Sequence, residues 1–203
     1  MLARSIVAIG VLSALGATAC GAFGPDEEDF KIAKAEYGLA NDAFGRGHYR
    51  EALDHIERSL ERDDSNSDAA YLGAMVMMVF CANDESSPDC RYEDAERYLR
   101  QALEATPDLR DAKNALGVVL VHRGRADEAI TILEPLTKDI LYRSPEKAWG
   151  NLGWAYYETH RHAEALEALR QAVQLQPRFC GAWFRMGQVH FAEGAGGGGD
   201  PSA

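Results

Sequence analysis

Residues 146–177 read EKAWGNLGWAYYETHRHAEALEALRQAVQLQP, and this stretch decides the fold of the chain. Numbered from Glu146, its first half places large side chains at positions 4, 7 and 11 and a small residue at position 8: Trp149, Leu152, Tyr156 and Gly153. Its second half has small, large and small residues at positions 20, 24 and 27, and a proline at 32: Ala165, Leu169, Ala172 and Pro177. Spacings of three and four place these residues on one stripe of each helix. The stretch therefore predicts two helices that pack closely together.

This unit resembles the tetratricopeptide repeat, a helix–turn–helix motif of 34 residues. The same pattern recurs in phase along the chain, with repeats near 33–66, 67–109, 110–145 and 146–179 and a half repeat at 180–194. We therefore predict an all-α fold, a tetratricopeptide-repeat α-solenoid of about four and a half repeats over residues 30–194. The half repeat is interpreted as a cap, or as a sign that the chain is shorter than its relatives. Residues 195–203 are glycine-rich and are predicted to be a disordered tail.

The N-terminal segment has the order of a secretory signal peptide: one basic residue, a short apolar run, and small residues up to Cys20. The apolar run is shorter than the roughly 20 residues of a comfortable membrane span. Small residues that end in a cysteine resemble a bacterial lipobox. That resemblance implies that residues 1–19 are removed and that Cys20 is acylated. An ordinary signal peptide that leaves a free cysteine is the alternative interpretation.

Gly21, which follows the lipobox cysteine, resembles lipoproteins that are sent to the outer membrane. The expected location is therefore the periplasmic face of that membrane, through a lipid anchor on Cys20. Residues 20–29 would form the acylated cysteine and a flexible tether to the solenoid.

Two cysteines stand at the mouth of an insertion in the second repeat. Cys81 is at position 15 when counted forward from Ser67, and Cys90 is at position 15 when counted back from Ala95. In an exported protein this indicates a Cys81–Cys90 disulfide that closes the inserted loop. A metal pair is the competing interpretation, although two thiols without a nearby histidine or third cysteine make a poor zinc site.

Tetratricopeptide arrays bind partners along the concave face, which is lined by the first helix of each repeat. The positions that line this face are about 2, 5, 9, 12 and 13 of each repeat. In this chain they are apolar and aromatic, which favours docking of a helix or an extended segment. Packing between repeats is the alternative role for some of these side chains. The predicted groove residues are Tyr37, Phe44, Tyr71, Met75, Met78, Val118, Val121, Trp154, Tyr157, Phe184 and Phe191.

The net charge of −11 argues against a nucleic-acid partner, because a phosphate-binding surface should be basic. The sequence contains no nucleophile motif, phosphate loop or His-Glu-x-x-His pattern, so we predict no enzyme activity, no cofactor and no small-molecule substrate. His160 and His162 form a His-x-His pair in the turn of the fourth repeat. They would need a carboxylate such as Glu158 or Glu164 to bind a metal, and no metal site is predicted.

The chain also resembles a narrower family, the type IV pilus secretin pilotins of the PilF/PilW/Tgl group. The resemblance lies in a Leu-Tyr-x-x-Pro linker formed by Leu141, Tyr142 and Pro145, together with the lipobox and the acidic tether. It implies a lipid-anchored scaffold that binds secretin subunits and promotes their assembly in the outer membrane. A lipoprotein scaffold for peptidoglycan enzymes, or for another envelope complex, is the alternative. A third possible class of function is that of an enzyme whose active site is not recognised from the sequence.

Overall fold

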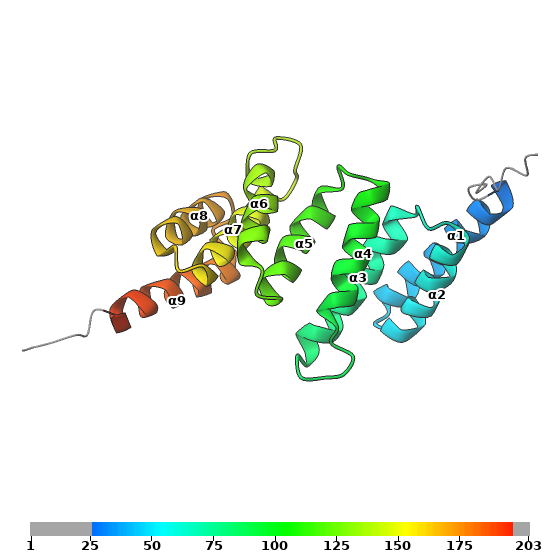
Figure 1. Ribbon diagram of the computed structural model, residues 1–203, viewed down its shortest axis with the longest axis horizontal. Helices are drawn as coiled ribbons and strands as arrows, with labels where there is room; N and C mark the ends of the chain where they lie inside the picture. The colour runs from blue at the N-terminus through cyan, green and yellow to red at the C-terminus, as the bar shows by residue number, and fades with distance from the viewer. Residues whose placement is uncertain (1–25, 197–203) are drawn as a thin grey trace, which may run out of the picture.

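The computed structural model describes residues 26–196, which form nine α-helices and no strand (Figure 1). The helices are α1 Glu27–Gly45, α2 Tyr49–Arg62, α3 Ser67–Asn83, α4 Tyr92–Ala105, α5 Arg110–His122, α6 Ala126–Thr137, α7 Pro145–Glu158, α8 His162–Leu175 and α9 Cys180–Gly196. The lipobox, Cys20 and residues 197–203 lie outside the described residues.

Each helix packs mainly on its neighbours in the sequence, and the pairs stack side by side along the long axis (Figure 1). The first and last helices therefore lie at opposite ends of the molecule. The buried core consists mainly of alanine, leucine and valine side chains, in one large cluster that runs from α1 to α8 and a smaller one between α8 and α9. Such an arrangement, in which each repeat contacts only the next, is that of a solenoid.

Small residues at position 8 allow the two helices of a repeat to approach closely. A Cβ atom added to Gly117 would lie 2.6 Å from Leu133, and one added to Gly153 would lie 2.6 Å from Leu169. Contacts that short do not occur between real side chains, so only glycine fits at these crossings. The close packing that the repeat pattern predicts is therefore built on particular glycines.

The first helix begins earlier than the sequence indicated. The predicted tether extends to residue 29, whereas α1 begins at Glu27. The cause is a helix cap: the Asp26 carboxylate accepts hydrogen bonds from the backbone N–H groups of Glu28 and Asp29, at 2.9 and 2.8 Å. Acidic side chains in the first turn also favour the positive end of the helix dipole. The solenoid therefore includes the last three residues assigned to the tether.

Two other helices extend further than their sequence patterns indicate. Pro135 stands inside the second helix of the third repeat, where a proline favours an interruption, but α6 continues past it to Thr137. Proline lacks the backbone N–H that would bond to the carbonyl four residues earlier. Because Pro135 is only two residues from the end of α6, little of the helix follows the missing bond. At the other end of the chain, α9 extends to Gly196, two residues beyond the predicted half repeat.

A buried carboxylate joins the second repeat to the third. Glu96 on α4 accepts hydrogen bonds from Arg100, Arg123 and Arg125, with the Arg100 and Arg125 contacts at 2.7 and 2.8 Å. Burial alone would raise the pKa of Glu96, but these arginines outweigh it and hold the pKa below its ordinary value. The carboxylate therefore stays ionised and fixes α4 to the turn that follows α5.

Candidate partner-binding surface

The odd-numbered helices form the inner side of the solenoid. Contacts join α1 to α3, α5 to α7 and α7 to α9. Within residues 26–196, no two even-numbered helices pack against each other in this way. A stack whose members are closer on one side curves toward that side, and solenoids use the resulting concave surface for binding. The eleven predicted groove residues all come from these odd-numbered helices.

The predicted groove residues differ widely in exposure. Phe184 and Phe191 on α9 are the most open, with 67% and 79% of their surface exposed. The following residues are partly buried against neighbouring helices: Tyr37, Phe44, Tyr71, Met75, Met78, Val118 and Tyr157. The inner surface is therefore apolar along its length, and it offers most free apolar area at the C-terminal end.

Two predicted groove residues are covered, which corrects the sequence-based expectation. Val121 and Trp154 retain only 6% and 9% exposure, so neither side chain is open to a partner. The Arg185 guanidinium lies 3.8 Å from the centroid of the Trp154 ring, and the His122 ring meets it edge-on at 4.7 Å. A large ring gains more by packing between three helices than by remaining exposed.

Trp154 belongs to a chain of contacts that crosses four repeats, from Tyr92 through His122 and Trp154 to Arg185. Its indole N–H donates to a Glu158 carboxylate oxygen at 2.9 Å, one turn further along α7. On its other side His122 stacks on Tyr92, with ring centroids 4.4 Å apart. Tyr92, His122 and Trp154 thus form an aromatic layer between α4 and α9 whose rings are fixed by one another and by Arg185, with Trp154 covered at its centre.

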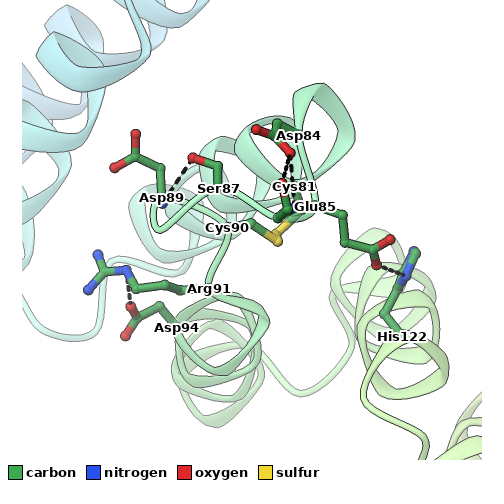
Figure 2. The surroundings of a disulfide bond; sticks show 10 residues. Cys81, Asp84, Glu85, Ser87, Asp89, Cys90, Arg91, Asp94 and His122 are labelled. Carbon is green, nitrogen blue, oxygen red and sulfur yellow. Dashed lines mark hydrogen bonds and ion pairs between the residues drawn. A yellow bond between two sulfur atoms is a disulfide. The ribbon is translucent and has the colours of Figure 1, made fainter.

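The inserted loop, residues 84–91, brings Glu85 next to His122, which is a member of this layer (Figure 2). Its Glu85 carboxylate lies 3.4 Å from the His122 Nδ1, and its Asp89 pairs with Arg50 on α2. Burial lowers the pKa of His122, while Glu85 acts in the opposite direction. The imidazole is therefore expected to be largely neutral at pH 7 and to act as an uncharged ring that stacks on Tyr92.

The structure joins Cys81 and Cys90 by a disulfide, with their Cα atoms 4.3 Å apart (Figure 2). The bond connects the end of α3 to the residue two places before α4, as the repeat positions indicated. It closes the loop that carries Glu85 toward His122. The insertion is therefore held as a compact loop next to His122.

We expect non-reducing peptide mapping of protein purified without reductant to recover Cys81 and Cys90 in one linked pair. Closing a loop of about ten residues stabilises the fold by about 2.7 kcal/mol at most in the chain-entropy model, so reduction should lower the melting temperature. Cys180 is exposed and should react with an alkylating agent, which supplies the internal control. Alkylation of Cys81 and Cys90 without prior reduction would contradict the pairing.

The linker that carries the resemblance to pilotins is half buried and half exposed. Tyr142 packs against Leu136 and Ala148, whereas Leu141 remains 67% exposed. Burial, and then the nearby Asp111 carboxylate, raise the pKa of the Tyr142 hydroxyl. Pro145 occupies the first turn of α7, where proline is well tolerated. The linker thus anchors α7 through its tyrosine and begins that helix with its proline.

The residues that sequence reasoning missed on this surface are Tyr92, Glu158 and Arg185. Tyr92 opens a second helix, and Arg185 stands at position 6 of its repeat, which the usual binding positions do not include. Glu158 and His122 stand at position 13 of their repeats, a position that lines the concave face, but their polar side chains do not belong to its apolar pattern. Only the rotation of one repeat relative to the next brings these polar groups onto the inner side.

The His-x-His pair does not form part of a metal centre in this structure. The rings of His160 and His162 are 6.3 Å apart, and Tyr157 stacks on His162 with centroids 5.9 Å apart. Within residues 26–196, no group of three or more histidine, cysteine, aspartate or glutamate side chains is placed to hold a metal ion. In the same part of the chain, no helix is both long and apolar enough to cross a bilayer.

Comparison with protein families identifies the repeats. Models of the tetratricopeptide repeat match residues 37–76, 91–140 and 146–179. The predicted all-α solenoid of tetratricopeptide repeats is therefore confirmed. No curated protein sequence matches the chain.

Solved structures with the same fold include three that differ in their described roles. The Pseudomonas aeruginosa pilF protein superposes with a TM-score of 0.66 at 22% identity, over 82% of this chain and 71% of that one. PilW, a type IV pilus biogenesis factor, superposes with a TM-score of 0.69 at 24% identity, over 81% of this chain and 71% of that one. YrrB, a tetratricopeptide protein with an unusual peptide-binding site, gives 0.64 at 22% identity, over 82% and 80%. At these identities the likeness concerns the fold.

Proposed function

We propose that this chain, whose residues 26–196 form a solenoid of tetratricopeptide repeats, is a lipid-anchored periplasmic scaffold that promotes secretin assembly for a type IV pilus. The observation that carries the proposal is the exposed apolar inner side of α9, where Phe184 and Phe191 remain open at the end of a preformed aromatic layer. The shared fold with two pilus proteins supports the choice of system.

The proposed activity is binding, and it follows from the chemistry of the inner side. Large aromatic side chains that stay in water lower the free energy of a complex when a partner covers them. Because the surrounding rings are already fixed by their neighbours, little side-chain entropy is lost on docking. A secretin subunit would contribute the apolar segment that fills this surface. The scaffold would thus hold subunits in place before they join into a multimer.

The proposed anchor increases the effect of binding. Cys20 precedes the first helical residue, Glu27, by seven positions. A chain extends by at most about 3.6 Å per residue, so the solenoid would remain within roughly 25 Å of an acylated Cys20. Tethering confines bound subunits to a thin layer at the outer membrane and raises their effective concentration there.

Complementation of a deletion strain tests the function. We expect loss of the heat-stable secretin multimer from outer membranes when the gene is deleted, and recovery when the full chain is restored. A Cys20→Ala variant should fold normally but leave the membrane fraction and restore little multimer. Antibody against the secretin measures the multimer, and fractionation after a carbonate wash measures the anchor.

Two outcomes would contradict this proposal separately. Normal multimer and normal pili in the deletion strain would reject the secretin role, and altered peptidoglycan in its place would favour the alternative envelope complex. If the Cys20→Ala variant stays in washed outer membranes, the lipid anchor is rejected while the scaffold role stands.

A further inference from the structure

Arg185 is in an unusual environment for an arginine of this chain. Most arginines in residues 26–196 form ion pairs with a carboxylate. Arg143, Arg178 and Arg185 form none within that range, and the first two are exposed to water. Arg185 is only partly exposed, so its guanidinium has neither full hydration nor a carboxylate partner within the described residues.

The position of the Arg185 guanidinium is fixed by Trp154. The cation lies over the ring at 3.8 Å from its centroid, an arrangement that contributes about 0.5–2 kcal/mol. Within residues 26–196 the guanidinium takes part in no hydrogen bond or ion pair, so its N–H donors are available to a partner. Glu158, the nearest carboxylate that affects its charge, accepts the Trp154 N–H instead. Burial lowers the pKa of Arg185 to about 10, so an anion placed beside it would relieve the cost of the charge.

Arg185 lies beside the most open part of the inner side. Gln188, Phe184 and Phe191 share one stripe of α9, and helical spacing places Arg185 next to it. The Gln188 side-chain oxygen is buried without a hydrogen-bond partner within residues 26–196. Arg185 thus joins the helix that carries the open phenylalanines to the Trp154 ring on α7.

We propose that Arg185 binds the carboxylate of an aspartate or glutamate side chain in the docked partner segment. This inference rests on the proposed docking function and names the chemistry of its partner. A planar guanidinium with free donors accepts a carboxylate in two parallel hydrogen bonds. The open Phe184 and Phe191 stand on the same helix as Arg185, and the rings of Trp154, His122 and Tyr92 continue from it on the other side. A segment that covers both sides must place its acid within the segment, and so on a side chain.

A peptide screen tests this assignment without knowledge of the natural partner. Twelve-residue random peptides with amidated C-termini are screened against the full-length protein in detergent. The selected peptides should combine large apolar residues with one aspartate or glutamate. A charged hydrogen-bonded pair contributes about 1.5–3 kcal/mol, so Arg185→Gln should weaken these peptides roughly tenfold or more. The same variant should bind peptides whose acid is replaced by its amide as well as the wild type does.

Arg178→Gln is the matched control, because it removes the same charge from an exposed site two residues before α9. It should leave peptide affinity unchanged. Circular dichroism of both variants checks that the fold is intact. Selected peptides without an acidic preference, or an Arg185→Gln effect that is equal for acid and amide peptides, would overturn the assignment and leave docking intact. If only peptides with a free C-terminal carboxylate bind, the carboxylate that Arg185 binds does not come from a side chain, and the assignment is overturned. If no peptide binds in either form, the docking function itself is contradicted.

Discussion

A Phe184→Ala/Phe191→Ala double variant is expected to lose at least about thirtyfold in affinity for the proposed partner, a secretin subunit. Large apolar side chains at the centre of an interface lose about 2 kcal/mol or more each on truncation, and 2 kcal/mol corresponds to roughly a thirtyfold change. Both rings are more than half exposed in the free protein, so their removal takes little from the folded core. Affinity should therefore fall while helicity and melting temperature stay close to the wild type.

Affinity is measured by calorimetry or fluorescence anisotropy with a purified secretin subunit, and the multimer level in outer membranes gives the cellular readout. Leu175→Ala is the control, because Leu175 is an exposed apolar residue at the end of α8, an even-numbered helix away from the inner side. Equal losses in the double variant and the control would indicate a general effect of surface hydrophobicity. Full affinity in the double variant would show that α9 does not form the docking surface.

Gly153→Val is expected to destabilise the protein by about 3 kcal/mol, whereas Gly187→Val should be close to neutral. Both glycines stand at position 8 of their repeats. A Cβ at Gly153 would lie 2.6 Å from Leu169, while a Cβ at Gly187 would have nothing within 4 Å. Overpacking a filled core costs about 1–3 kcal/mol or more. At an open helical site, the change from glycine gives a small gain in helix propensity.

Thermal melting followed by circular dichroism measures the difference. A loss of 3 kcal/mol corresponds to roughly 6–12 °C for a protein of this size. Since α9 has no following helix packed over Gly187 within the described residues, its variant also serves as the control for the substitution itself. Equal melting temperatures for the two variants would mean that the close helix crossing at Gly153 is not maintained in solution.

The sequence alone was sufficient for the fold, because the repeat is defined by local spacing. Large residues at positions 4, 7 and 11, with small residues at 8, 20 and 27, determine which stripe of each helix is buried and how closely two helices pack. The position of the inserted loop also followed from counting, since Cys81 and Cys90 occupy the same repeat position from opposite directions. These features depend on residues that are near in the chain.

Only the tertiary structure decided which side chains on the inner side are open. The periodicity of α7 predicts that Trp154 and Tyr157 both line the groove. In the structure, however, Trp154 is covered and Tyr157 is partly open. What covers Trp154 is Arg185, which is thirty-one positions later and belongs to a different repeat. The buried Glu96 likewise meets arginines that lie 27 and 29 residues away. The rotation and spacing between successive repeats set these contacts, and a pattern within one repeat does not encode that geometry.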